Sequence, residues 1–141
     1  KAYRWAMDRY MEDPAGYRLP PDCWEEIQKV SNREYTSGFL KGGEEGTICL
    51  GEERPSPMST LAGVIKDRGK DGWVSIDVRA RIMIGDTLEH MGTTFPNLVF
   101  PLSDMKTLNE EECREAHEGD HVRVRLPARA EPGDLLRKRI A

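Results

Sequence analysis

Hydrophobic and polar positions follow two different periods along this chain, one typical of helices and the other typical of strands. Near the start, Tyr3, Ala6, Met7 and Tyr10 recur at the spacing of one face of an amphipathic helix. This pattern predicts a helix over residues 2–12.

A second helix is predicted after a short interruption. The Asp-Pro-Ala-Gly run at 13–16 ends the first helix, because proline cannot continue a helix and glycine accommodates a turn. The Pro-Pro-Asp run at 20–22 suits a helix N-terminus. Trp24, Ile27 and Val30 then recur at helical spacing, so the first part of the chain is predicted to form a two-helix arm.

Strict alternation of apolar and polar side chains predicts two strands further along, over residues 74–82 and residues 121–126. Residues 107–119 fit a strand and a turn, but the capping-box spacing of Asn109 and Glu112 favours one or two helical turns. The weaker strand candidates, separated by glycine-containing turns, are Thr47–Leu50, Leu61–Lys66, Thr87–Met91 and Leu98–Leu102.

Short strands without long helices between them indicate a mainly β fold. Closing such strands into a small β-barrel removes exposed strand edges. We therefore expect a closed β-barrel of about six strands, preceded by the two-helix arm. The predicted division places a helical linker arm at 1–41 and the β-barrel domain at 42–141.

Composition narrows the class of protein. A chain of 141 residues with 38% hydrophobic and 33% charged residues is long enough to fold as one domain with an added arm. Its net charge of −4 argues against a protein that binds nucleic acid over its whole surface. No apolar run approaches the ~20 residues that span a bilayer, so we expect no membrane contact.

Cysteine usage and the first residue indicate a compartment and a context. Cys23, Cys49 and Cys113 are odd in number, far apart and in no paired motif, which is typical of reduced cytoplasmic thiols. No charged-then-apolar leader is present, so we expect a cytoplasmic protein. Because the first residue is Lys1 rather than Met and a predicted helix follows it at once, we expect a piece of a longer protein.

Residues that would support hydrolysis are not arranged in a recognised motif. The sequence contains no His-Glu-x-x-His run and no Gly-x-Ser-x-Gly run. Cys113, His117 and His121 have i, i+4, i+8 spacing, which could present them to a metal if the segment were helical. Such a set on an acidic surface helix is usually incidental. We therefore expect no catalytic residue, metal or cofactor in this segment.

Four arginines are predicted to point away from the core on the two alternating strands. They are Arg79, Arg81, Arg123 and Arg125. If the strands are neighbours, the guanidinium groups form one patch suited to phosphate, and the basic run at 137–139 extends it. The alternative is an ordinary charged surface, with Asp77 and Glu89 as ion-pair partners.

A segment between the arm and the strands has neither helical nor strand periodicity. It reads Ser-Asn-Arg-Glu-Tyr-Thr-Ser-Gly-Phe over residues 31–39. This S-x-R-x-Y-T-x-G-F run resembles a motif of the collagenase-like peptidase family U-32, which links a catalytic barrel domain to a small C-terminal β-domain. Further similarity follows the order of the family over residues 3–10, 74–79, 84–89, 122–127 and 132–137.

The resemblance implies a docking role for this segment. On the N-terminal catalytic domain of the same protein, Arg33 would pair with an acid or with the C-terminal end of a helix, and Tyr35 and Phe39 would fill pockets. The alternative is that these side chains attach the arm to its own barrel. Many family members carry histidine at Asn32, so any chemical role of that histidine is absent or altered here. The candidate docking residues are Ser31, Asn32, Arg33, Tyr35, Gly38 and Phe39.

The resemblance also implies a function. We expect a non-catalytic C-terminal accessory domain that positions substrate or a partner for the N-terminal catalytic domain. Some family members act in hydroxylation of tRNA or ribosomal RNA, so the alternative is an RNA-contacting module. The resemblance implies that those members use an iron–sulfur cluster held by cysteines of the catalytic domain. The cysteines of this chain do not fit such a cluster motif, so the cluster would belong to the catalytic domain. Whether the parent protein cleaves peptides or modifies RNA stays open.

A second resemblance concerns the fold alone. The barrel half is similar to the second domain of translation elongation factors, in which an arginine-bearing strand runs into an Ile-x-x-Gly-Asp turn, here residues 82–86. Gly-Asp turns occur in many tight β-connections. Likeness of fold does not transmit function, so this comparison only supports the predicted barrel.

Overall fold

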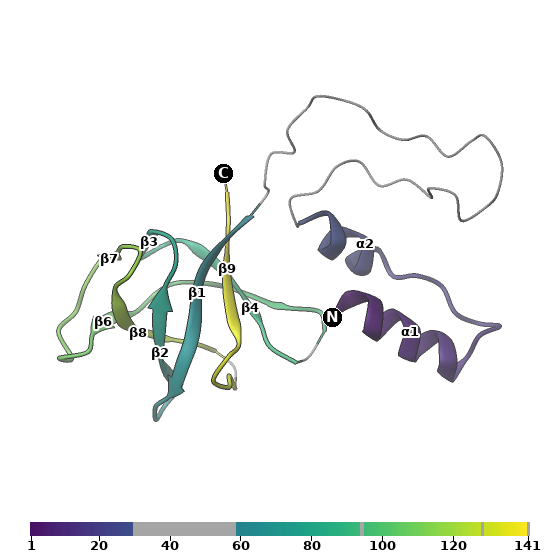
Figure 1. Cartoon of the computed structure of the whole chain (residues 1–141), viewed down its shortest axis with the longest axis horizontal. Helices are drawn as coiled ribbons and strands as arrows, with labels where there is room; N and C mark the ends of the chain where they lie inside the picture. The colour runs from purple at the N-terminus through teal and green to yellow at the C-terminus, as the bar shows by residue number, and fades with distance from the viewer. Residues whose placement is uncertain (30–58, 94, 128, 141) are drawn as a thin grey trace.

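Two helices and a curled β-sheet make up the described part of the chain (Figure 1). The computed structural model describes residues 1–29, 59–93, 95–127 and 129–140. The strand predicted at Thr47–Leu50 and the predicted boundary between 41 and 42 lie outside these ranges. The elements are α1 (Ala2–Glu12), α2 (Pro21–Gln28), β1 (Ser59–Arg68), β2 (Trp73–Val78), β3 (Ile82–Met83), β4 (Thr87–Met91), β5 (Leu98–Pro101), β6 (Met105–Thr107), β7 (Glu115–Ala116), β8 (His121–Arg125) and β9 (Leu135–Arg139).

The two predicted helices are confirmed, and they lie side by side next to the sheet (Figure 1). α2 begins with Pro21 and carries Asp22 in its first turn, where a fixed φ and a negative charge favour a helix start. After α1, the Asp13 carboxylate accepts a hydrogen bond from the Gly16 N–H at 3.0 Å and so stabilises the turn. Neither helix is long and apolar enough to cross a membrane among the residues described.

The face of α1 that packs against the rest of the protein is not the predicted apolar stripe. Tyr3 and Met7 of the stripe are 65% and 59% exposed, whereas Ala2 is buried and Trp5 is half-buried. The predicted periodicity is therefore correct, but most of the stripe remains on the surface.

All neighbouring strands of the main sheet run antiparallel, in the order β5-β4-β9-β1-β2-β8-β6. β9, the last strand in the sequence, lies between β4 and β1. β3 and β7 form a separate two-stranded sheet, in which Ile82 pairs with Ala116. The fold is mainly β with two preceding helices, as the sequence predicted.

The prediction of a closed, six-stranded barrel is wrong. The main sheet is a curled half-barrel of seven strands, and its edge strands β5 and β6 are not paired with each other in the described residues. β5 has four residues and β6 has three. Short edge strands expose little unpaired backbone, so closure is not needed to protect this sheet.

The inner face of the curled sheet holds the hydrophobic core. Alternate residues of β2 and β8 point inward and are nearly inaccessible, as the alternating pattern predicted. The buried core consists of Ala62, Ile65, Val74, Ile76, Val78, Ile82, Leu88, Phe100, Leu102, Met105, Ala116, Val122, Val124, Leu126, Ala130 and Leu136. The opposite side of these strands, here called the outer face, carries Trp73, Ser75, Asp77, Arg123 and Arg125.

Two segments differ from their predictions. The alternating run 74–82 predicted one strand, but β2 ends at Val78, where the backbone bends before β3 begins. At the bend, the Arg79 N–H still donates to the Ala62 carbonyl at 2.8 Å, so the chain turns while remaining bonded to β1. The predicted helical turns over residues 107–119 are not formed, because that segment contains β7 and tight turns instead.

β9 was not predicted, because the run Leu-Leu-Arg-Lys-Arg has no apolar alternation. Leu136 points into the core and is 0% exposed, and Arg137 on the opposite face is only 6% exposed. A strand that is covered on both faces does not need to alternate. The covering element over Arg137 is α2, through the contacts described below.

A tight hairpin turn between β1 and β2 places Trp73 at the start of β2. The Gly69 N–H donates to the Trp73 carbonyl at 2.8 Å, and Asp71 and Gly72 have φ angles of 56° and 81°. Gly72 also contacts the residue after β8, because its carbonyl accepts a hydrogen bond from the Leu126 N–H at 2.8 Å. A Cβ at Gly72 would lie 2.8 Å from the Leu126 carbonyl oxygen, so this position requires glycine for two reasons.

Replacing Gly72 by alanine is expected to destabilise the fold more than replacing Gly85. Both have positive φ, 81° and 95°, which costs an alanine about 1 kcal/mol. A Cβ at Gly85 meets open space, whereas one at Gly72 meets backbone. We expect Gly72→Ala to lose about 2–4 kcal/mol in total, measured by urea unfolding. Equal losses for the two variants would contradict the steric role of Gly72.

Candidate functional site

A buried ion-pair network joins α2 to the sheet. Arg137 of β9 donates from Nη2 to Glu26 Oε2 of α2 at 2.7 Å and to Glu89 Oε2 of β4 at 2.8 Å. Lys29, directly after α2, donates from Nζ to Glu89 Oε1 at 2.8 Å and to Glu26 Oε2 at 3.2 Å. Two cations and two carboxylates are therefore interleaved at one contact. We call Glu26, Lys29, Glu89 and Arg137 the arm network.

Burial and pairing together set the charge state of this network. The side chains of Arg137 and Glu26 are 8% and 10% exposed. Burial by itself disfavours the Arg137 guanidinium, but its hydrogen bonds to Glu26 and Glu89 raise the pKa of Arg137. Burial likewise disfavours the Glu89 carboxylate, but hydrogen bonds from Lys29, Asn97 and Arg137 lower its pKa. Arg137 and Glu89 are therefore both charged at neutral pH.

Contacts on either side of the network add to the joint between arm and sheet. The Trp5 ring of α1 packs against Phe95, with ring centroids 5.1 Å apart. At the start of β1, the Ser59 hydroxyl donates to the Lys29 carbonyl at 3.0 Å. Asn97 donates to Glu89 Oε1 at 3.0 Å. The arm is thus attached through both of its helices to separate parts of the sheet region.

We expect Arg137→Ala to lower the free energy of unfolding by about 3–5 kcal/mol, because it leaves the buried carboxylates of Glu26 and Glu89 with only the single charge of Lys29 between them. Arg139→Ala is the matched control. Arg139 is exposed on the same strand, and its truncation should change stability by about 0.5 kcal/mol or less. Urea unfolding measures both variants. A loss for Arg137→Ala as small as that of the control would contradict the importance of the network.

The arm network was not found by sequence reasoning. The docking residues predicted at Ser31, Asn32, Arg33, Tyr35, Gly38 and Phe39 lie outside the described residues, so their role stays a prediction. Arg137 was assigned to a basic surface patch, and Glu89 was considered only as a partner for surface arginines. The one available signal was the pair Leu135-Leu136 directly before the basic residues, which is typical of a buried strand.

Arg79 and Arg81 follow the end of β2, and each is already paired with a carboxylate. Arg79 Nη2 lies 2.7 Å from Asp77 Oδ2, and Arg81 Nη2 lies 2.7 Å from Glu115 Oε2. The hydrogen bond from Arg81 lowers the pKa of Glu115. Asp77 was the partner that the charged-surface alternative proposed for an arginine here.

Arg123 and Arg125 lie on the outer face of β8, where they pair in register with Ser75 and Trp73 of β2. β2 and β8 are therefore neighbours, as a shared patch requires. Arg123 forms an ion pair with Glu110, whereas Arg125 is exposed and forms none with any carboxylate of the described residues. Arg123 and Arg125 thus lie opposite the first half of β2, whereas Arg79 and Arg81 follow its other end.

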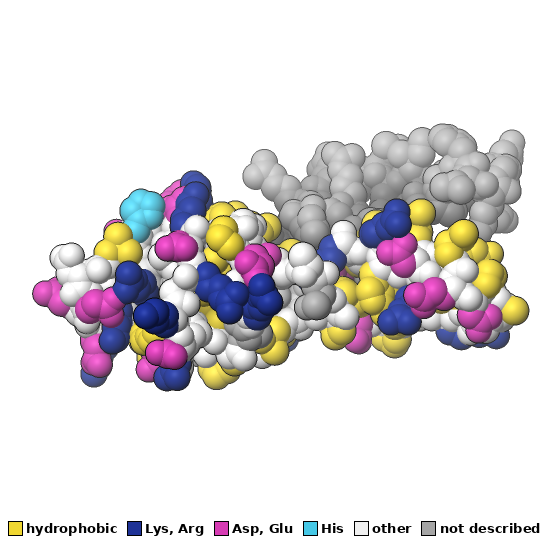
Figure 2. Space-filling model, turned by 90° about the horizontal axis from the view of Figure 1, so that it is seen from below, with side chains coloured by type: hydrophobic (Ala, Val, Ile, Leu, Met, Phe, Trp, Pro, Cys, Tyr) yellow, Lys and Arg dark blue, Asp and Glu magenta, His cyan; other side chains and the backbone are white. Residues whose placement is uncertain are grey.

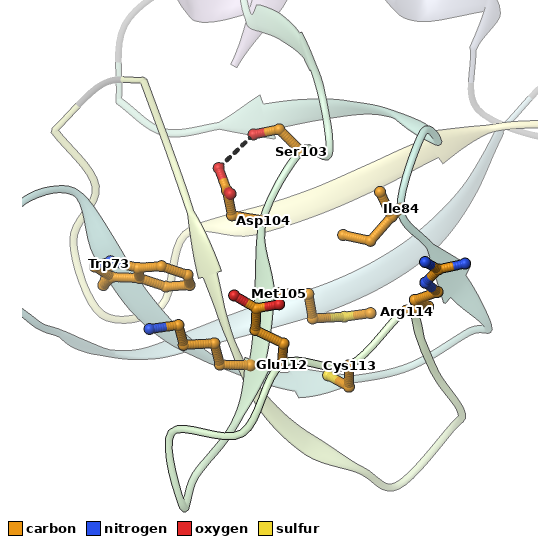
Figure 3. A pocket seen from close by; sticks show the side chains of 9 residues that line it. Trp73, Ile84, Ser103, Asp104, Met105, Glu112, Cys113 and Arg114 are labelled. Atoms are coloured by element: carbon orange, nitrogen blue, oxygen red, sulfur yellow. Dashed lines mark hydrogen bonds between the residues drawn. The ribbon is translucent and has the colours of Figure 1, made fainter.

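A depression of about 350 Å³ opens beside Trp73 (Figure 3). Trp73 lines one side, and Cys113 and Arg114 lie across from it. The Ser103 hydroxyl donates to Asp104 Oδ2 at 2.7 Å in the same depression. An indole, a cation and hydrogen-bonding side chains thus line one hollow of the surface.

The depression does not have the chemistry of a nucleophilic or metal site. Burial raises the pKa of the Cys113 thiol, and the charge of Asp120 acts in the same direction, so the thiol stays protonated. Cys113, His117 and His121 do not share a helix. Within the described ranges, no three His, Cys, Asp or Glu side chains are grouped to hold a metal. Of the two cysteines that the structure describes, Cys23 lies on α2 and Cys113 lies between β6 and β7.

Figure 2 shows that the surface differs between the arm and the sheet. Over the sheet region, Lys and Arg side chains gather with Asp and Glu among them, and over the helices many hydrophobic side chains are exposed. Tyr3, Met7 and Met11 of α1 are 65%, 59% and 75% exposed. The arm therefore offers an apolar surface beside a charged one.

The sequence model of the peptidase family U32 C-terminal domain matches residues 58–137. The chain therefore belongs to this family, as the motif resemblance predicted. Two crystal structures of the C-terminal domain of a Geobacillus thermoleovorans protein assigned to the U32 peptidases, one a selenomethionine variant, have TM-scores of 0.53 and 0.52. Each is 20% identical, and they cover 56% and 57% of this chain and 99% and 92% of their own. At this identity the likeness shows the fold alone.

A curated relative extends well beyond the similar region. The "tRNA hydroxylation protein P1" of Bacillus subtilis (strain 168) is 24% identical over 143 residues, which cover 96% of this chain and 33% of the relative. The chain thus spans about a third of the length of the curated relative that it matches.

Proposed function

We propose that this chain is a non-catalytic accessory domain of a longer U32 protein, and that it positions substrate or a partner for the catalytic domain. The arm network carries this proposal, because Arg137 donates to Glu26 of α2 and Glu89 accepts from Lys29 directly after α2, which fixes the arm to the sheet through charge-assisted bonds. An arm fixed in this way presents its surface at a constant angle. The coverage of a third of the curated relative supports a place within a longer protein.

The exposed apolar residues of α1 supply the surface for this docking. Tyr3, Met7 and Met11 lie outside the sheet contact, where a second folded domain can cover them. The candidate docking residues at 31–39 follow α2 directly in the sequence and would extend the same contact. The proposed partner is the N-terminal catalytic domain of the same protein.

The test uses the full-length protein, assayed for tRNA hydroxylation and for peptide hydrolysis. We expect no turnover by the 141-residue chain alone. In the full-length protein, Arg137→Ala should lower turnover by about tenfold or more, because a small displacement of bound substrate is costly in rate. Arg139→Ala is the matched control. Turnover by the isolated chain, or full activity of both variants, would overturn the proposal.

A second candidate function is contact with RNA. The name of the Bacillus subtilis relative concerns tRNA hydroxylation, and the similarity covers 96% of this chain. Arg125 supports this candidate because its guanidinium is exposed and has no carboxylate partner among the described residues, which leaves it available for phosphate.

Arg125→Glu should therefore weaken binding of labelled tRNA more than Arg79→Glu, whose guanidinium is already paired with Asp77. For Arg125→Glu, we expect the slope of the logarithm of the binding constant against the logarithm of the salt concentration to fall by about one, because one phosphate contact is lost. Fluorescence anisotropy across a salt series measures this. Binding without salt dependence, or binding that survives Arg123→Glu combined with Arg125→Glu, would refute RNA contact at this face.

A further inference from the structure

Trp73 lies where three hollows of the surface meet. It lines the depression of about 350 Å³ shown in Figure 3, a second of about 350 Å³ beside β1 and β2, and a broader one of about 720 Å³ beside the β1–β2 turn. Its side chain is half-buried on the outer face, so part of the indole remains accessible. The hairpin turn and the ladder to β8 hold the backbone of Trp73 on both sides. The backbone that carries the indole is therefore held in place before any ligand arrives.

Cations without a carboxylate partner gather around this indole. In the described part of the chain, six Lys or Arg side chains form no ion pair: Lys1, Arg18, Lys70, Arg114, Arg125 and Arg139. Three of these six border Trp73. Lys70 lies in the preceding turn, Arg114 lies across the depression, and Arg125 is the cross-strand partner. These unpaired charges are available for phosphate groups.

A further cation lies directly against the indole. Lys106 of β6 pairs in register with Arg123, and its Nζ lies 5.0 Å from the centroid of the Trp73 ring. A cation at this distance is attracted to the ring face and occupies it, so a base would stack on the opposite face of the ring. The Ser103 hydroxyl and the Asp104 carboxylate line the same depression and can exchange hydrogen bonds with a polar planar ligand.

This combination matches an unpaired nucleotide. Unstacked bases of RNA are bound by stacking on aromatic side chains, with hydrogen bonds to their edges and cations on the backbone. Cross-strand neighbours have Cβ atoms about 5 Å apart, so the long Arg125 side chain can reach a phosphate next to a base on Trp73. Glu110 and Glu112 also border this region, so charge alone gives weak attraction and stacking must supply affinity.

We propose that Trp73 stacks one unpaired base of an RNA while Arg125 and Lys70 contact the flanking phosphates. This site rests on the RNA-contact function proposed above, and it places the contact at the Trp73 end of β2 and β8 rather than at Arg79 and Arg81. Bases in a duplex are already stacked on each other, so the site favours single-stranded segments over duplex.

The experiment measures binding of the 141-residue chain to a labelled single-stranded RNA oligonucleotide and to the same oligonucleotide in a duplex. Trp73→Ala should weaken single-strand binding by about tenfold, the loss expected for one stacked base, and should affect duplex binding much less. Trp73→Phe should retain most of the affinity, because an aromatic face remains. Trp24→Ala is the matched control, since Trp24 is an exposed tryptophan on α2.

The outcomes separate this site from the RNA-contact function itself. If the wild-type chain binds neither RNA, both proposals fail. If Arg125→Glu weakens binding while Trp73→Ala does not, RNA contact stands and the stacking site is overturned. Equal losses of single-strand and duplex binding for Trp73→Ala would also overturn it.

A spectroscopic measurement covers the case in which Trp73→Ala does not fold. In a Trp5→Phe, Trp24→Phe background, Trp73 is the only tryptophan of the chain. Stacking of a base on its ring should quench its fluorescence as single-stranded RNA is added, with a midpoint equal to that of the binding curve. Unchanged emission at saturating RNA would overturn the proposal.

Discussion

The buried guanidinium of Arg137 determines how the helical arm and the sheet are arranged. It lies on β9 and donates to Glu26 of α2 and to Glu89 of β4, so one side chain connects three elements that are far apart in the sequence. Lys29 supplies a second positive charge and balances the two carboxylates. Without Arg137, the two acids would share only the charge of Lys29 in a poorly solvated contact.

Such a network favours one arrangement over others more than it adds stability. An apolar contact of the same volume could give similar stability, because taking charges out of water offsets much of their attraction. An apolar contact would, however, tolerate sliding of α2 over the sheet. The directed hydrogen bonds from Arg137 to Glu26 and from Lys29 to Glu89 cross between arm and sheet and do not tolerate sliding, so the arm has one defined orientation. A defined orientation is what a positioning domain needs.

The two proposed contact surfaces lie at different parts of one sheet. The arm is attached at β4 and β9, and the Trp73 site lies on β2, β8 and β6, on the other side of β1 in the strand order. The hydrogen-bonded strands between them therefore set the distance from the arm to the Trp73 site. Under the proposed function, RNA held at Trp73 and a catalytic domain covering the arm are kept at a constant separation.

The sequence predicted the parts of the fold whose residues alternate or repeat, and it failed where burial involved charge. Val74, Ile76 and Val78 identified β2 because only one face of that strand is buried. β9 was missed because Arg137 is buried by ion pairs, which the apolar pattern cannot reveal. The pairing of Arg79 with Asp77, by contrast, follows from alternation, because residues two apart on a strand share a face.

The candidate site was predictable only in part. The positions of Arg123 and Arg125 followed from alternation, whereas the role of Trp73 depends on which strands are neighbours. Lys106 approaches Trp73 across β8, and β6 is too short to be predicted from three residues. Contacts between strands distant in the sequence require the topology.

A double-mutant cycle between Glu26 and Arg137 tests the central interaction most directly. Glu26→Gln, Arg137→Met and the combined variant are compared with the wild type by urea unfolding of the 141-residue chain. If the buried pair joins arm and sheet, the two single losses will exceed the loss of the double variant by about 1 kcal/mol or more. Additive losses, within about 0.5 kcal/mol, would contradict a direct energetic link between α2 and β9.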